Sequence, residues 1–222
     1  MPIVKFIQKY KWAILPTKNK ISIKDIKEKT KIYSEEFRWI RTSRSKELCW
    51  SWRLAQEIGW DIVSPIDVEM KPLDDIQITN DLTEIKSLND FISNSHVWRR
   101  DKEAIVMPKQ SWVNLYQYKS KENWESIFIP NGDGSVEWHL GFNIRIPKLT
   151  YLLVLPFHRK TGLDVEMGIL DKKSLDKMNS VSSMSIVIRP NCKIKIQRGD
   201  KIAKLILLGA DVLNALAENQ MN

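Results

Sequence analysis

The sequence predicts a mainly β protein of the α+β class, on the strength of three observations. Apolar and polar residues alternate in the C-terminal half, most clearly over Ile186 and Ile188 and again over Ile194 and Ile196. Side chains of a strand point to opposite faces with a period of two, so this alternation is typical of half-buried strands. A turn-forming Gly199-Asp200 pair follows the second run. Helical spacing, by contrast, is clear in a single segment.

That segment runs from Ser45 to Ile58, where Trp50, Leu54 and Ile58 repeat at the i, i+4, i+8 spacing of one helix face. Gly59 follows as an expected C-terminal cap. Weak alternation in residues 1–15 predicts an edge strand, and residues 23–30 predict a short polar helix. Further strands are expected over residues 60–65, 68–70, 103–106 and 111–118, and a strand with a short helix over residues 74–92.

Strands dominate after the turn predicted at Asn131-Gly132-Asp133-Gly134. They are expected over residues 136–146, 149–156, 183–188, 193–197 and 203–208, and residues 210–222 are expected to be a short helix or disordered. All nine tryptophans lie between Trp12 and Trp138. We therefore expect a single domain with a Trp-rich N-terminal part, residues 1–130, and a β core, residues 131–209.

Composition restricts the classes of partner. The 222 residues carry a net charge of +8, which favours anionic partners such as nucleotides, with nucleic acid as an alternative. No run of about 18 apolar residues predicts a membrane helix, and no signal-peptide pattern is present. Cys49 and Cys192 lie far apart, which fits a reducing cytoplasm. The abundance of lysine and isoleucine suggests an AT-rich genome, that of a phage or a bacterium.

Three segments of the C-terminal half resemble the motifs of one known family. Pro156-Phe157-His158-Arg159-Lys160-Thr161-Gly162-Leu163 resembles a P-R-S-G-L-A phosphate-binding element. Gly168-Ile169-Leu170-Asp171 resembles a G-V-I-D segment, and residues 196–206 resemble an I-x-x-G-D-R-I-A-Q-L-I strand pair. These are motifs of the trimeric dUTPase and dCTP deaminase family. The resemblance implies a distorted jelly roll with a short N-terminal helix, a nucleotide ligand with Mg²⁺ held through its phosphates, and a homo-oligomer, with a trimer as the first expectation.

The sequence differs from the family's motifs at positions that the family uses for catalysis and phosphate binding. Lys160-Thr161 stands in the region of the phosphate-binding serine, and Lys172-Lys173-Ser174-Leu175 stands where the family has D-Y-R-G. The early A-G-Y-D element leaves a trace in Leu140-Gly141-Phe142-Asn143, and the sequence closes on DVLNALAENQMN in place of a Gly-rich arm. We therefore expect a protein that binds a nucleotide or another phosphorylated or anionic ligand without dUTPase activity. Its overall plan, with Gly59-Trp60-Asp61-Ile62-Val63-Ser64-Pro65, is also similar to small bacterial proteins of no assigned activity.

Two basic clusters are the candidate ligand-binding residues. His158, Arg159 and Lys160 follow an apolar strand, where a guanidinium fork and a mobile ammonium suit an anion. Trp98, Arg99 and Arg100 combine an aromatic ring with two cations, which suits an anionic ring ligand. The alternative for the first cluster is a solvated basic loop. For Trp50 and Trp60 we expect packing in the core rather than stacking on a ligand.

Two enzymatic alternatives remain open. Asp171 is the candidate catalytic residue of a divergent nucleotide hydrolase, because the resemblance places the family's motif there. Glu137 and His139 lie at i and i+2, hence on one strand face, and with His158 they are candidates for an Fe²⁺ site of the oxygenase type. Asp164 and Glu166 share a face that is expected to meet solvent. A self-assembling interaction or structural protein is the third hypothesis.

Overall fold

The computed structural model describes residues 3–36, 49–73, 77–79, 95–100, 103–121, 123–157, 162–213 and 215. Within these ranges most elements are strands, arranged as antiparallel sheets, so the predicted mainly β class is confirmed. No helix in these ranges is long and apolar enough to cross a membrane.

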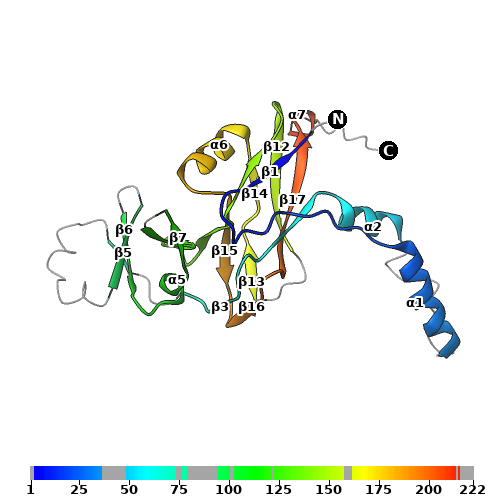
Figure 1. Cartoon of the computed structure of the whole chain (residues 1–222), viewed down its shortest axis with the longest axis horizontal. Helices are drawn as coiled ribbons and strands as arrows, with labels where there is room; N and C mark the ends of the chain where they lie inside the picture. The colour runs from blue at the N-terminus through cyan, green and yellow to red at the C-terminus, as the bar shows by residue number, and fades with distance from the viewer. Residues whose placement is uncertain are drawn as a thin grey trace, which may run out of the picture.

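Elements of the N-terminal part lie at both ends of the molecule. Figure 1 shows α1 and α2 extending from one end and β5, β6 and α5 lying towards the other. The bounds are β1 Lys5–Gln8, α1 Ile23–Glu36, α2 Trp50–Glu57, β2 Trp60–Val63, β3 Val68–Met70, β4 Gln77–Thr79, β5 Ser95–Arg100, β6 Glu103–Pro108, α5 Trp112–Leu115, β7 Gln117–Ser120, β8 Asn123–Ser126 and β9 Phe128–Pro130.

The C-terminal elements lie between these two ends (Figure 1). Their bounds are β10 Val136–His139, β11 Phe142–Arg145, β12 Thr150–Pro156, β13 Leu163–Val165, β14 Gly168–Leu170, α6 Lys172–Val181, β15 Ser185–Pro190, β16 Ile194–Ile196, β17 Lys201–Gly209 and α7 Ala210–Leu213.

The two largest sheets are antiparallel and four-stranded, with the strand orders β13-β15-β10-β9 and β14-β12-β17-β2. Smaller sheets pair β1 with β11, β16 with β3, β7 with β8, and β6 with both β4 and β5. Trp138 of β10 and Phe128 of β9 are fully buried, and their ring centroids lie 5.2 Å apart. The core therefore joins strands of the Trp-rich part to strands of the C-terminal part.

Helix α2 confirms the part of the predicted helix that the structure describes, since residues 45–48 lie outside the described residues, but its packing differs from the prediction. Trp50, Leu54 and Ile58 remain 65%, 48% and 44% exposed, so the expectation that Trp50 lies in the core is wrong. The helix end is held by polar contacts instead, because Lys204 Nζ donates hydrogen bonds to the carbonyl oxygens of Gln56 and Ile58. Trp60 is partly buried and packs against the core, as expected.

Residues 136–146, expected as one strand, form two strands, β10 and β11, with Gly141 between them. Gly141 has a φ of +76°, and a Cβ there would lie 2.6 Å from the ring of Trp12. The segment expected as a strand over residues 111–118 begins instead with the short helix α5. The closing strands β16 and β17 do not pair with each other, because β16 pairs with β3 and β17 with β12 and β2.

Candidate ligand-binding site

A cleft of about 900 Å³ lies where β5, β7, β8, β10 and α6 meet. It contains aromatic rings, carboxylates, imidazoles, hydroxyls and one ammonium group. Its lining residues are His96, Val97, Trp98, Gln117, Tyr118, Trp124, Glu125, Ser126, Ile129, Glu137, His139, Ser174, Lys177, Met178, Val181 and Ser182. The size and the mixture of apolar and polar groups are those of a site for a small organic molecule.

Glu137 and His139 of β10 both line the cleft, which confirms that they share one face of the strand. Trp138 between them points into the core, where it is fully buried. Ser185 Oγ donates a hydrogen bond of 2.6 Å to Glu137 Oε1, and Ser182 Oγ lies 3.1 Å from His139 Nδ1. Ser185 is the first residue of β15, the strand paired with β10, and Ser182 ends α6 three residues before it. The two polar groups of this strand are therefore held by hydroxyl groups of β15 and of the end of α6.

Aromatic side chains form the other walls. Trp98 of β5 is partly buried against the core, whereas Trp124 of β8 is 67% exposed. The indole N–H of Trp98 is buried and has no hydrogen-bond partner within the described part of the chain. A buried donor without a partner is unfavourable, so an acceptor on a ligand would stabilise it. The two rings suit the faces of a planar ligand.

Tyr118 and Glu125 form a hydrogen-bonded pair beside these rings. The phenol donates a 2.6 Å hydrogen bond to Glu125 Oε2. This bond, followed by one from Ser120, holds the pKa of Glu125 below its ordinary value of 4.5. Burial and the hydrogen bond to Glu125 raise the pKa of Tyr118. Glu125 therefore stays an ionised acceptor at neutral pH, and Tyr118 stays a donor.

Of the predicted ligand-binding residues, Trp98 lines the cleft. Arg99 and Arg100 are the last residues of β5, opposite Ala104 and Glu103 of β6 in the strand register. The other predicted cluster, His158, Arg159 and Lys160, follows β12 and lies outside the described residues.

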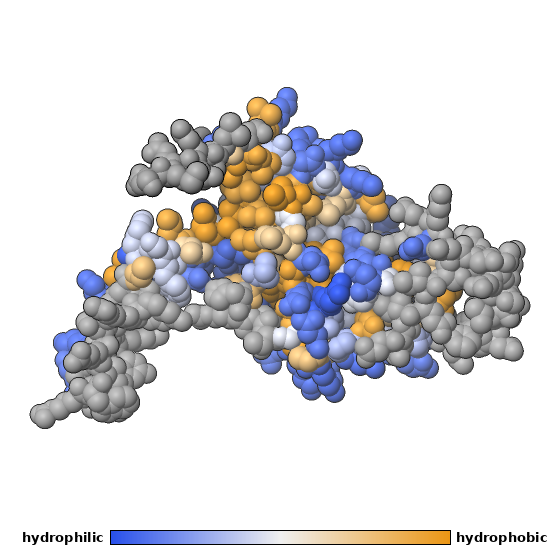
Figure 2. Space-filling model, turned by 180° about the vertical axis from the view of Figure 1, so that it is seen from behind, coloured by the Kyte–Doolittle hydropathy of each residue, from blue (hydrophilic) through white to orange (hydrophobic). Residues whose placement is uncertain are grey.

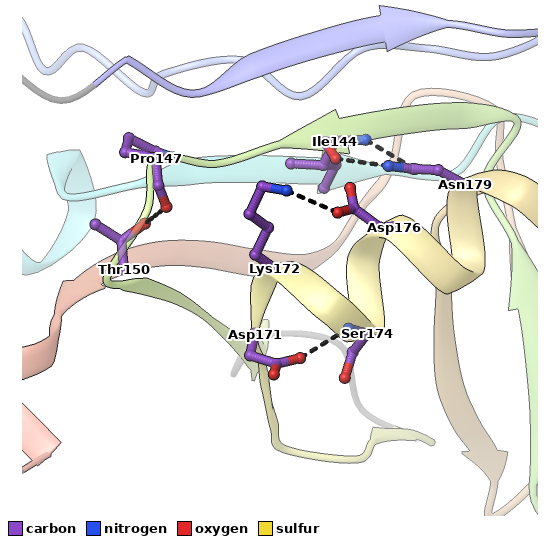
Figure 3. Close-up of polar contacts among 8 residues, drawn as sticks. All are labelled: Ile144, Pro147, Thr150, Asp171, Lys172, Ser174, Asp176 and Asn179. Atoms are coloured by element: carbon purple, nitrogen blue, oxygen red, sulfur yellow. Dashed lines mark hydrogen bonds and ion pairs between the residues drawn. The ribbon is translucent and has the colours of Figure 1, made fainter.

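Asp171 does not line this cleft. It caps the N-terminus of α6, where its carboxylate accepts a 2.7 Å hydrogen bond from the backbone N–H of Ser174 (Figure 3). Hydrogen bonds from the side chain and the backbone of Ser174 lower the pKa of Asp171. It lines a separate pocket of about 430 Å³ with Thr150, Lys172 and other residues. A carboxylate with a depressed pKa is a poor general base at neutral pH.

Replacing Asp171 by alanine is expected to lower the melting temperature without changing ligand binding in the cleft, because it removes a helix cap. Asp171→Asn, which keeps a capping side chain, is the matched control and should melt closer to the parent protein. The depressed pKa means that the cap stabilises above pH 3.8, the ordinary value, and is lost as pH falls through the lowered pKa. Thermal melts at neutral and acidic pH test this. Equal melting of all three proteins would show that the cap is without effect.

The described residues contain no cluster of side chains that is arranged to bind a metal ion. No group of three His, Cys, Asp or Glu side chains there is close enough to hold an ion. Glu137 and His139 are brought together, but the third predicted ligand, His158, lies outside those residues. Asp164 and Glu166 are exposed, as expected, and Asp164 accepts a hydrogen bond from Asn191.

Helix α6, which supplies one wall of the cleft, was not predicted from the sequence. Leu175 is the buried residue of this helix, and Met178 packs partly against the core three residues later. The side chain of Asn179 donates to the carbonyl of Ile144 and accepts from its N–H, which fastens α6 to β11 (Figure 3). Two features of the sequence could have predicted this helix. Asp171 is a good N-cap residue, and Leu175 and Met178 follow it at the i, i+3 spacing of one helix face.

Comparison with known proteins gives similarities of structure. No protein-family model matches the chain, and no curated protein matches it. The dUTPase of Staphylococcus bacteriophage 80alpha, solved with dUpNHpp, has a TM-score of 0.42 and 12% identity, covering 99% of this chain and 87% of that chain. The dUTPase from phage phi11 of S. aureus has a TM-score of 0.40 and 11% identity, covering 99% and 95%. The EIAV dUTPase has a TM-score of 0.34 and 14% identity, covering 76% and 86%. All three of these structures are of dUTPases.

Proposed function

We propose that the protein binds a nucleotide, or a related phosphorylated ligand with an aromatic ring, in the cleft between β5, β8, β10 and α6. One observation carries the proposal: the rings of Trp98 and Trp124 line the same cleft as hydrogen-bonding groups that neighbouring strands hold in place. Stacking on a base is tolerant of sequence and contributes about 1–3 kcal/mol per base. The polar groups then fix the orientation of the ligand.

Charge supports an anionic ligand. The chain has a net charge of +8, and Lys177 of α6 supplies an ammonium group to the cleft. An excess of positive charge raises the local concentration of anions and their rate of association. Arg99 and Arg100, which follow Trp98 on β5, and the cluster of His158, Arg159 and Lys160 remain our candidates for contacts to phosphates.

Binding without dUTPase chemistry is the form of this function that we favour. Asp171, the candidate catalytic residue, is engaged in capping α6 and does not line the cleft. Its lowered pKa also disfavours a role as general base. We therefore expect that the protein does not increase the rate of dUTP hydrolysis above that of the uncatalysed reaction.

Trp98→Ala is expected to weaken nucleotide binding roughly 10-fold or more, because it removes a stacking surface. Isothermal titration with nucleoside triphosphates and Mg²⁺ measures the change. Trp50→Ala is the matched control, since Trp50 is 65% exposed on α2 and does not line the cleft. Equal loss in both variants, or no binding of any nucleotide to the parent protein, would refute the proposal.

We also propose that the protein forms a homo-oligomer, because apolar side chains are exposed on one face of a central sheet. Ile169, Leu153 and Ile206 are paired across β14, β12 and β17, so they share one face of a sheet, and Ile169 is 50% exposed. Figure 2 shows a broad apolar area over the middle of the molecule seen from behind, with hydrophilic residues around it. Exposed apolar areas are typical of interaction surfaces. Light scattering, with a trimer as the expected mass, tests this.

A further inference from the structure

We propose that Ser182 and His139 act as nucleophile and general base, and that together they hydrolyse a small carboxylic ester in the cleft. Ser182 Oγ lies 3.1 Å from His139 Nδ1, and both residues line the cleft. A hydroxyl group within hydrogen-bond reach of an imidazole is the arrangement that activates a serine nucleophile. The inference goes beyond the proposed function, because it concerns a reaction of two side chains that nucleotide binding does not require.

The backbone holds these two side chains at this distance. Ser182 is the C-cap of α6, and its backbone N–H donates a hydrogen bond to the carbonyl of Met178. The carbonyl oxygen of Ser182 accepts a hydrogen bond from the ammonium group of Lys9. His139 is the last residue of β10, is 4% exposed, and donates from its backbone N–H to the carbonyl of Ile127. Nucleophile and base are therefore positioned by regular elements, which place side chains more precisely than loops do.

His139 acts as a base through the nitrogen that already faces Ser182. In the tautomer without a proton on Nδ1, this nitrogen accepts the hydrogen of the hydroxyl group. The reaction makes no use of the second ring nitrogen, so other interactions of the imidazole are compatible with it and help to orient the ring. The base therefore needs no group beyond the one that the structure places beside it.

Two features of the surroundings stabilise the imidazolium ion that forms when His139 takes the proton. The C-terminal end of α6, which Ser182 caps, carries a partial negative charge that favours a cation. Besides the hydrogen bond from Tyr118, a charge interaction with His139 helps to lower the pKa of Glu125, so the ionised carboxylate in turn favours the protonated imidazole. Glu125 is thus a positioning residue, and it also lines the cleft.

The residue after the nucleophile supplies a donor for the oxyanion of the reaction. Ser183 is 1% exposed, and within the described part of the chain its backbone N–H makes no hydrogen bond. A buried donor without a partner is unfavourable, so an acceptor beside it is stabilised. The backbone N–H of the residue after the nucleophile is one of the oxyanion donors in serine hydrolases. A single donor of this kind contributes about 100- to 1000-fold to the rate.

The reaction has two balanced steps. In the first, Ser182 Oγ bonds to the acyl carbon while its proton passes to His139 Nδ1. The bond between the acyl carbon and the alcohol oxygen then breaks, and the alcohol leaves with the proton from His139. In the second, water attacks the acyl carbon and gives a proton to His139, the bond from the acyl carbon to Oγ breaks, and Ser182 takes the proton back as the carboxylic acid leaves.

The walls of the cleft indicate the class of ester. Met178 and Val181 precede Ser182 within about one turn of α6 and also line the cleft, which suits a short apolar acyl group. The rings of Trp98 and Trp124 suit an aromatic alcohol part. An aryl ester with a short acyl chain meets both conditions, and p-nitrophenyl acetate is the simplest probe of this kind.

The test uses the full chain with p-nitrophenyl acetate and, separately, with a fluorophosphonate that bonds covalently to activated serines. We expect release of p-nitrophenol, and mass spectrometry of peptides should locate the label on Ser182. Ser182→Ala is expected to lower the rate of hydrolysis at least 100-fold, by roughly the contribution of general base catalysis, and to abolish the labelling. Ser180→Ala is the matched control, because Ser180 is exposed on the same helix and does not line the cleft.

Labelling at another residue, or hydrolysis that persists in Ser182→Ala, would overturn this inference. Its failure is distinguishable from that of the proposed function. If the protein binds a nucleotide through Trp98 but is neither labelled nor able to hydrolyse the ester, only the esterase proposal is wrong. If Ser182 is labelled and the ester is hydrolysed while no nucleotide binds, only the proposed function is wrong.

Discussion

Asp61→Ala is expected to lower the free energy of unfolding by about 3–5 kcal/mol, because it leaves a buried cation without its anionic partner. The Asp61 side chain is 2% exposed and that of Lys204 is 11% exposed, and Lys204 Nζ lies 3.0 Å from Asp61 Oδ1. Lys201 adds a contact of 2.6 Å to the other oxygen from a position that is 38% exposed. Removing the carboxylate leaves Lys204 with the carbonyls of Gln56 and Ile58 as its polar partners.

Urea denaturation of single and double variants tests this account. The pair Asp61→Ala with Lys204→Met removes both charges and should recover part of the stability lost in the single variant, since an apolar side chain replaces the buried cation. Asp176→Ala removes an ion pair with Lys172 in which both side chains are 55% exposed, and should change stability by less than about 0.5 kcal/mol. An unchanged denaturation midpoint for Asp61→Ala would contradict the importance of the buried pair.

Strands were predictable where one face is buried and the other is not. β15 and β12 show buried residues at alternate positions, for example Ile186 and Ile188 in β15 and Leu152 and Val154 in β12, which is the pattern that the sequence displays. Pairing was not predictable in the same way. The family motif that residues 196–206 resemble is a strand pair, but β16 and β17, on either side of the turn at Gly199-Asp200, join different sheets. Alternation records burial and carries no information about the neighbouring strand.

A small part of the candidate site could be predicted from the sequence. Glu137 and His139 share a face because strand geometry requires it, and Trp98 was identified from its aromatic ring. Trp124 and the residues of α6 were not, because they reach the cleft through tertiary packing between elements distant in the chain. The exposed Trp50 shows the same limit, since helical periodicity predicts an apolar face and not what covers it.

Polar contacts explain how a helix with an exposed apolar face stays in place. Lys204 Nζ binds the carbonyl oxygens at the end of α2 and the carboxylate of Asp61, so β17 joins the helix end to β2. Gly59 lies directly between α2 and β2, the two elements that this lysine connects. The backbone at this junction is therefore expected to tolerate little change.

Gly59→Ala is accordingly expected to lower the free energy of unfolding by about 2–5 kcal/mol, from two effects. The φ of +73° is unfavourable for alanine by about 1–2 kcal/mol, and a Cβ would lie 1.9 Å from the carbonyl oxygen of Leu205, which forces β17 to move at about 1–3 kcal/mol more. Gly134→Ala separates the effects, because Gly134 has a φ of +84° with nothing within 4 Å of a Cβ. Denaturation of both variants should show the larger loss at Gly59. Equal losses of unfolding free energy in the two variants would mean that β17 moves away from the added Cβ at no cost. The close approach of Gly59 to Leu205 would then not restrain the junction between α2 and β2.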